Sequence, residues 1–253
     1  MGKQYLLILT ATITPASGVK VERSDPALRR ADYRDAFTYW LNHADPRLKN
    51  ILLIENSGAD LSEFKAAADK SNKQVEIISI PPNPPPAGMH YGYSELQMID
   101  HGLEQSQFWA KATHLIKATG RLYFPDLPRL LDSVPEDFKI VVDARARLPF
   151  RPSEKGFVSA QLFLAQHEFY DSTMRKSYHS LAKEFHYPSL VEHLFFELLT
   201  PLRQQNGVLL RFPVNCEPVG FAGHLHKRYD SPGRLAAAKA RSILRVVAPD
   251  FWF

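Results

Sequence analysis

Short apolar runs recur along the first half of the chain, and amphipathic stretches separate them. Each run has the length of a strand buried on both faces, and apolar residues in the stretches between them return at the spacing of a helix. The predicted strands lie at 5–13, 51–54, 75–80, 114–117 and 139–143. The predicted helices lie at about 25–43, 61–71, 93–109 and 125–131. Strands and helices that alternate in this order predict an α/β fold with a mostly parallel central sheet flanked by helices.

The second half of the chain has a less regular pattern. Residues 157–169 are expected to form another strand, and a helix capped by Ser189 should run through Leu199. A strand then begins near Gly207, and a basic helix covers about 234–246. No internal repeat and no sharp shift in composition marks a second domain. We therefore expect a single domain over 1–253, with a nucleotide-binding half at about 1–147 and an acceptor-side half at about 148–253.

Composition narrows the class of protein. The chain has 253 residues, of which 45% are hydrophobic and 23% charged, as in ordinary globular domains. Its single cysteine, Cys216, excludes an internal disulfide and favours a reducing compartment, so we expect a cytoplasmic protein. The formal charge of +4 permits phosphate-rich partners. No nucleic-acid-binding motif is present, and we expect no nucleic-acid partner.

Ligands of open α/β sheets bind beyond the carboxyl ends of the strands, so the residues that follow each predicted strand are candidates for a site. The segment Lys117-Ala118-Thr119-Gly120-Arg121 places two cations, a hydroxyl group and a glycine within one turn. Such a loop can approach and neutralise a diphosphate. The alternative is a structural turn with solvated charges.

Polar residues also follow the first two predicted strands. Thr10 and Thr12 lie where the first strand delivers its loop, and Glu55 and Asn56 end the second strand. These side chains could contact a nucleotide base or ribose. The alternative is that they are polar residues tolerated at strand ends and in a plain turn.

The segments 54–58, 94–98 and 117–121 together resemble bacterial polysaccharide glycosyltransferases with a GT-A-like, Rossmann-related fold, of the WavE-like kind. The resemblance extends more loosely through 191–195 and 220–223. It implies transfer of a monosaccharide from a nucleotide-sugar donor to a bacterial surface glycan, as in lipopolysaccharide or capsule assembly. A non-catalytic nucleotide- or glycan-binding module of an assembly complex is the alternative function.

One departure from the GT-A pattern bears on metal dependence. Many enzymes of that fold carry an aspartate-x-aspartate pair that holds a divalent metal, whereas this chain has Asp143-Ala144-Arg145. The second carboxylate ligand is missing. Arg145 could supply fixed positive charge to the leaving diphosphate instead, so we expect metal-independent transfer and no firm cofactor. A manganese or magnesium ion on Asp143 is the alternative.

An inverting transfer needs a base for the acceptor hydroxyl, and the resemblance implies Glu192 or His193. Ser189 to Glu192 also reads as a capping box, which would give Glu192 a structural role. His224 and His226 could close over the diphosphate or the acceptor, or could form a solvated basic loop.

The C-terminal segment is basic and amphipathic, with Arg234, Lys239, Arg241 and Arg245 interspersed among apolar residues. Such a surface could rest on the anionic inner membrane and meet a lipid-linked acceptor. The alternative is a terminal helix that packs on the domain and exposes its basic face to solvent.

Overall fold

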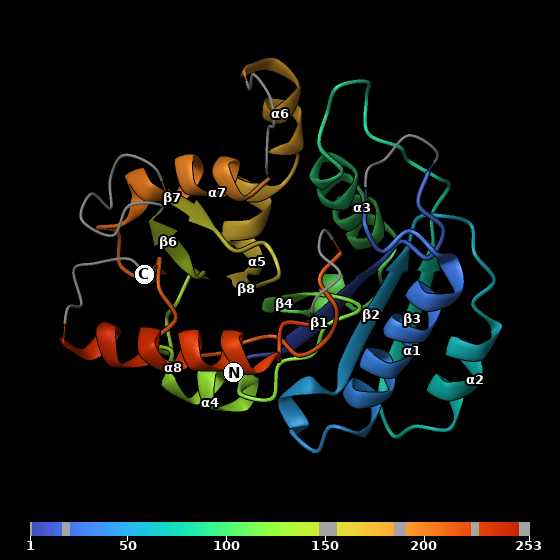
Figure 1. The fold of residues 1–253 in the computed structure, drawn as a ribbon, viewed down its shortest axis with the longest axis horizontal. Helices are drawn as coiled ribbons and strands as arrows, with labels where there is room; N and C mark the ends of the chain where they lie inside the picture. Colours follow the sequence, from blue (N-terminus) through green and yellow to red (C-terminus); the bar gives the residue numbers. More distant parts are fainter. Residues whose placement is uncertain (1, 17–20, 147–155, 185–190, 224–227, 248–253) are drawn as a thin grey trace.

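The computed structural model describes residues 2–16, 21–146, 156–184, 191–223 and 228–247. In these residues a seven-stranded sheet has the order β3-β2-β1-β4-β8-β5-β9. Figure 1 labels its strands β3, β2, β1, β4 and β8. Its strands are β1 (Tyr5–Ala11), β2 (Asn50–Glu55), β3 (Gln74–Ser79), β4 (His114–Thr119), β5 (Ile140–Val141), β8 (Leu162–Gln166) and β9 (Val208–Leu209). Strands β3, β2, β1 and β4 pair in parallel, and β8 alone runs antiparallel, to β4 on one side and β5 on the other. The predicted α/β fold with a mostly parallel sheet is confirmed.

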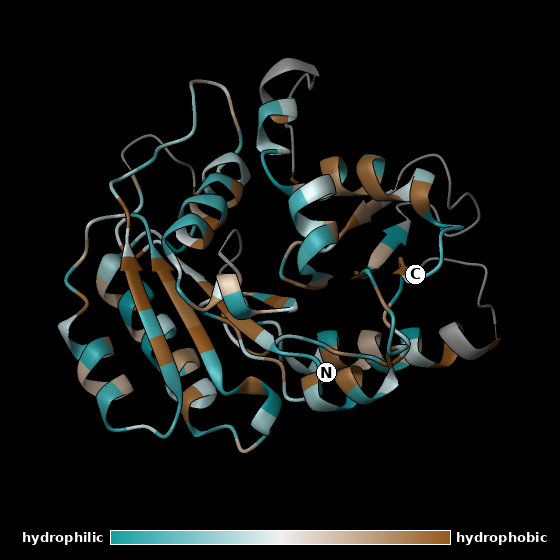
Figure 2. Ribbon diagram, turned by 180° about the vertical axis from the view of Figure 1, so that it is seen from behind, coloured by the Kyte–Doolittle hydropathy of each residue, from teal (hydrophilic) through white to brown (hydrophobic). Residues whose placement is uncertain are grey.

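Alternation along the strands builds a core on each face of the sheet. Leu6 and Ile8 of β1 face one core, and Leu7 and Leu9 face the other. Helices α1 (Pro26–Asn42), α2 (Ser62–Asp69) and α4 (Leu127–Ser133) cover the second face, while α3 (Gly92–Gln105) and α7 (Val191–Leu199) cover the first. Brown bands predominate in the longer strands of Figure 2, and β1, β2 and β4 are buried along almost their whole length because helices cover both faces of the sheet there. Asp25 caps α1, since its carboxylate accepts from the amide of Ala27.

The predicted strand at 157–169 is wrong as a single element. The chain instead forms β7 (Gly156–Val158), then β8, and then a helical segment made of α5 (His167–Phe169) and the π-helical η3 (Tyr170–Met174). The break occurs because the amide of Ser159 donates to the carbonyl of Asp143, and the carbonyl of Gln161 accepts from Thr119. Strand β7 pairs with β6 (Ala144–Ala146) in a separate ribbon.

Two helices complete the described chain. The short α6 (Tyr178–Glu184) has no counterpart among the predicted elements, and α8 (Pro232–Val247) confirms the predicted C-terminal helix. The capping box proposed for α7 depends on Ser189, which lies outside the described residues. Among the helices described, none is both long and apolar enough to cross a bilayer.

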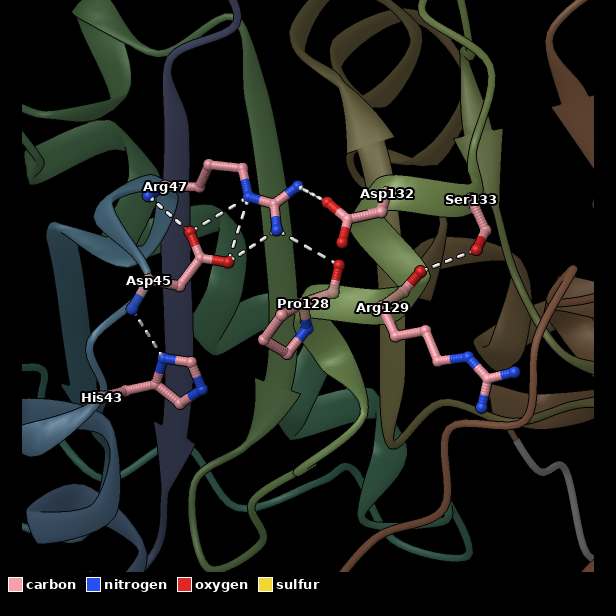
Figure 3. A network of polar contacts seen from close by, with 7 residues as sticks. All are labelled: His43, Asp45, Arg47, Pro128, Arg129, Asp132 and Ser133. Carbon is pink, nitrogen blue, oxygen red and sulfur yellow. Dashed lines mark hydrogen bonds and ion pairs between the residues drawn. The ribbon is translucent and has the colours of Figure 1, made fainter.

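A polar network fastens the amino-terminal edge of the sheet (Figure 3). Arg47 lies in η1 (Pro46–Leu48), just before β2, and its guanidinium donates to Asp45 at 2.6 Å and to Asp132 at 2.6 Å. It also donates to the carbonyl of Pro128 at 3.2 Å, so one side chain joins the start of β2 to α4. This network lies at the edge opposite the strand carboxyl ends, where ligands of such sheets bind.

The order of the strands reverses at β1, because β2 follows it on one side and β4 lies on the other. Thr10 and Thr119 are partners in register at this point. The amide of Gly120 donates to the carbonyl of Thr10 at 2.9 Å, and a Cβ on Gly120 would lie only 2.5 Å from that oxygen. Gly120 therefore permits the close approach of the two strand ends, which marks the topological switch point of the sheet.

Candidate functional site

A cavity of about 420 Å³ opens at the carboxyl ends of β1 and β4. It lies at the switch point of the sheet, where ligands of doubly wound folds bind. The residues singled out from the sequence that line this first cavity are Thr10, Thr12, Asn56, Thr119, Arg121 and Glu192. The site is thus assembled from segments more than a hundred residues apart.

Arg121 brings a guanidinium group to the first cavity. Its Nε donates to the carbonyl of Phe221 at 3.2 Å, and no carboxylate in the described chain forms an ion pair with it. Burial acts to lower its pKa, but Tyr33 and Tyr229 act in the other direction, and the pKa of the guanidinium is raised overall. Gly223 leaves room for this group, because a Cβ there would lie 2.6 Å from Nη2.

Arg29 adds a second guanidinium that has no carboxylate partner among the described residues. Its side chain is 4% exposed, and Nε donates to the carbonyl of Thr12 at 2.7 Å while Nη2 donates to the hydroxyl of Tyr33 at 3.0 Å. The Tyr33 hydroxyl also accepts from the amide of Thr12 at 3.1 Å. Arg29 therefore fixes the loop that leaves β1 and keeps a positive charge in the wall of the first cavity.

Lys117 does not line the first cavity, in contrast to Arg121 from the same predicted loop. It is 1% exposed, and its Nζ donates to Glu95 Oε1 at 2.7 Å, to the carbonyl of Ala160 at 2.6 Å and to Thr119 Oγ1 at 3.2 Å. These acceptors use all three ammonium donors. The buried side chain of Lys117 thus connects β4 to α3 and to the segment before β8.

Glu95 is the acidic partner of Lys117 and lines the first cavity. Its Oε1 also accepts from the hydroxyl of Thr10 at 2.9 Å. Burial acts to raise the pKa of Glu95, but the nearby ammonium of Lys117 and the two hydrogen bonds lower it overall. The carboxylate is therefore held ionised and oriented.

Glu55 and Asn56 have different environments. Glu55 is fully buried and accepts from the amides of Ile13 at 3.1 Å and Ser57 at 2.9 Å, so it shapes the turns after β1 and β2. Asn56 lines the first cavity, where its Nδ2 donates to Asn83 Oδ1 at 2.6 Å. Asn56 thereby connects the end of β2 to the proline-rich segment at 81–86, which contains Asn83.

Glu192 lies in the first turn of α7 and has an unusual environment for a carboxylate. Its Oε2 is buried and has no hydrogen-bond partner in the part of the chain that the structure describes. Burial raises the pKa of Glu192, and the negative charge of Glu95 adds to the effect. Burial also raises the pKa of Tyr91 to about 12, and here Glu192 contributes. A carboxyl group with a raised pKa and an oxygen that no described group occupies is a candidate for proton transfer.

A second cavity, of about 510 Å³, adjoins the first, and Gln161, Glu192 and Tyr229 line both. Arg145 and His193 line only the second cavity. Arg145 donates to Asp143 at 2.8 Å and lies 3.6 Å from a carboxylate oxygen of Glu217. The structure therefore separates the predicted set, with the residues from β1 and β4 in one cavity and Arg145 in the other.

Asp143 lines neither cavity in the described structure. It is 2% exposed, and its Oδ2 is held by Arg145. No group of three histidine, cysteine, aspartate or glutamate side chains gathers within the described ranges. A divalent cation prefers several oxygen ligands, and metal-independent transfer stays a prediction from the sequence. His224 and His226 lie outside the described residues.

No family model and no curated protein matches the chain. Among solved structures it is similar to 4-diphosphocytidyl-2C-methyl-D-erythritol synthase from Anaerococcus prevotii, with 12% identity, a TM-score of 0.47, and coverage of 95% of this chain and 96% of that one. It is also similar to HddC from Yersinia pseudotuberculosis, with 12% identity, a TM-score of 0.45, and coverage of 94% and 99%. A glycosyltransferase from Streptococcus pneumoniae gives 12% identity and a TM-score of 0.46 over 78% of this chain and 43% of that protein. The WavE-like resemblance stays a prediction from the sequence.

Proposed function

We propose that this chain is a glycosyltransferase that moves a monosaccharide from a nucleotide-sugar donor to a bacterial surface glycan. The observation that carries the proposal is the pair of guanidinium groups in the first cavity, Arg121 and Arg29, neither of which forms an ion pair with a described carboxylate. A buried cation without an anionic partner is costly unless a ligand supplies the charge. The diphosphate of a nucleotide sugar supplies it at the switch point of the sheet.

The donor would extend from the strand ends into the first cavity. Thr12, Asn56 and Asn83 offer hydroxyl and amide groups for the base and ribose, and Arg121 would bind the diphosphate. Residues of the half at about 1–147 supply these groups. Lys117 and Glu55 do not line the first cavity, but their hydrogen bonds to Ala160 and Ser57 position the ends of β4 and β2.

Glu192 would act as the base for an acceptor that enters from the second cavity. Its carboxylate takes the proton of the acceptor hydroxyl while that oxygen forms a bond to the anomeric carbon of the sugar. The bond from that carbon to the phosphate oxygen breaks, and Arg121 stabilises the negative charge that the nucleotide gains. Because Glu192 lines both cavities, one side chain can serve the donor and the acceptor. His193 and Arg145, which line the second cavity, would contact the acceptor side.

The C-terminal helix offers a further element of this proposal. Leu235, Ile243 and Val247 are 51%, 63% and 69% exposed, and their spacing of eight and four residues places them on one side of α8. Lys239 lies between them in the same row. We include peripheral contact with an anionic membrane through this row, which would bring a lipid-linked acceptor near the site.

The test is nucleotide binding by an Arg121→Ala variant. UDP, GDP, dTDP, CMP and their sugar derivatives are screened by thermal shift on the unaltered protein, because a ligand of the folded state raises the melting temperature. The best ligand is then titrated against Arg121→Ala and against Arg129→Ala, which removes an exposed arginine of α4 away from the cavity. We expect Arg121→Ala to weaken binding about tenfold or more, since a charged hydrogen bond contributes about 1.5–3 kcal/mol.

Turnover then separates an enzyme from a binding module. Slow release of free sugar from the bound donor, without an acceptor, supports catalysis, and binding without any release supports the non-catalytic module. Failure of every nucleotide to bind the unaltered protein, or equal affinity in the two arginine variants, would remove the first cavity as a donor site.

A further inference from the structure

The wall of the second cavity has three arginines, and only two of them form ion pairs with described carboxylates. Arg145, Arg234 and Arg241 contribute three guanidinium groups to its wall, from β6 and from two turns of α8. Glu217 accepts from Arg241 at 2.8 Å and lies 3.6 Å from Arg145, while Asp143 pairs with Arg145 at 2.8 Å. These two carboxylates account for Arg145 and Arg241 and leave Arg234.

Arg234 has no carboxylate partner in the part of the chain that the structure describes. Its guanidinium lies 4.7 Å from the centre of the Tyr229 ring, which holds the group at the wall by a cation–π contact. Arg234 is half-buried, so water screens its charge less than it would on an open surface. In addition, Nε of Arg241 is buried without a hydrogen-bond acceptor. Among the described residues, the cavity therefore has one guanidinium group without an ion pair and one unused donor.

Arg234 lies in the cavity from which the acceptor is proposed to enter. Tyr229, which supports Arg234, also lines the first cavity, as do Gln161 and Glu192. A molecule in the second cavity can thus present a hydroxyl to Glu192 while another of its groups reaches Arg234. Within the described residues, Glu192 forms no ion pair with Arg145, Arg234 or Arg241.

We propose that the second cavity is an acceptor subsite that selects a sugar carrying an anionic group, a phosphate or a carboxylate, and that Arg234 binds this group. This inference rests on the proposed function and adds the chemical class of the acceptor. A neutral sugar would leave the guanidinium of Arg234 without an anionic partner. An oxyanion matches its planar donors and adds a charge-assisted hydrogen bond.

The experiment compares three probes by isothermal titration: glucose 6-phosphate, glucuronate and glucose. They are titrated against the unaltered protein, Arg234→Gln, Arg234→Lys and Lys239→Gln, the last of which removes an exposed cation on the same helix. We expect at least one anionic probe to bind the unaltered protein at least tenfold more tightly than glucose. Arg234→Gln should abolish that advantage, while Arg234→Lys should retain part of it and Lys239→Gln all of it.

Arg121→Ala separates this inference from the proposed function. It should lose nucleotide affinity and keep the anionic probe, whereas Arg234→Gln should lose the probe and keep the nucleotide. Equal affinity for glucose and both anionic probes, or unchanged binding of the preferred probe by Arg234→Gln, would overturn the inference even if nucleotides bind. Loss of the probe in Arg121→Ala alone would assign the anion to the first cavity and would equally overturn it.

Discussion

Replacing Glu192 by glutamine should leave the protein as stable as before, or more stable, while it abolishes transfer. The change keeps the shape of the side chain and removes the ionisable group. A buried polar atom without a hydrogen-bond partner costs about 1–3 kcal/mol, and Oε2 of Glu192 is such an atom among the described residues. The amide relieves part of this cost because it carries no charge beside Glu95.

The effect should depend on pH with a definite sign. Because the pKa of Glu192 is raised in the folded protein, the folded state keeps a proton that the unfolded chain releases near the ordinary glutamate pKa. Stability therefore falls as the pH rises from that ordinary value through the raised one. Above this window the unaltered protein bears the full cost of the charge, and Glu192→Gln bears none. At a pH below the window the two proteins should melt together.

Melting temperatures at pH 4 and pH 8 and the rate of transfer measure the two consequences. A gain of about 1 kcal/mol at pH 8 corresponds to roughly 2–4 °C for a domain of this length. Transfer should fall by about two to four orders of magnitude, the contribution of a general base. Glu197→Gln, an exposed carboxylate on the same helix, should change neither quantity. A melting temperature that drops by several degrees at pH 8, or turnover that survives the change, would refute the assignment of Glu192 as a base.

Two other predictions concern the strand ends and the metal. Gly120→Ala should lower the free energy of unfolding, measured in urea, by about 1–3 kcal/mol, because the new Cβ would lie 2.5 Å from the carbonyl oxygen of Thr10. Gly2→Ala is the control, since a Cβ there has no atom within 4 Å, and it should leave the stability unchanged. A Gly120→Ala variant as stable as the unaltered protein would contradict the close approach. EDTA should leave transfer intact because Arg145 already holds Asp143, whereas loss of activity that manganese restores would show that an ion is required.

The sequence predicts the sheet and most of its helices because the spacing of apolar residues and the caps of helices depend only on nearby residues. Its apolar runs match β1 to β5 to within a few residues, and the helix predicted at about 25–43 matches α1. The failure at 157–169 has a non-local cause. The backbone groups of Ser159 and Gln161 form hydrogen bonds with those of Asp143 and Thr119, and the local sequence pattern does not indicate these partners.

The sequence predicts where the candidate residues lie in the fold but not which way their side chains point. The sequence places Lys117 and Arg121 in one loop and cannot tell which of them enters the cavity. In the fold, Lys117 shares a face of the sheet with Thr10 and meets Glu95, twenty-two residues away in the chain. Arg29 could have been found, since it precedes Tyr33 and Phe37 by four and eight residues on the buried side of α1. A cation on an apolar helix face calls for a partner or a ligand.

The two proposed anion sites place competing demands on the carboxylate between them. A bound diphosphate and an anionic acceptor would each disfavour the ionised form of Glu192, whose pKa burial has already raised. A base that stays protonated cannot accept the hydroxyl proton. Arg121 and Arg234 would therefore serve two purposes, because each cancels the charge of the ligand that it binds and so limits the further rise in the pKa of Glu192. On this reasoning the cations on either side of Glu192 do more than hold substrates, since they also keep the base available when both substrates are bound.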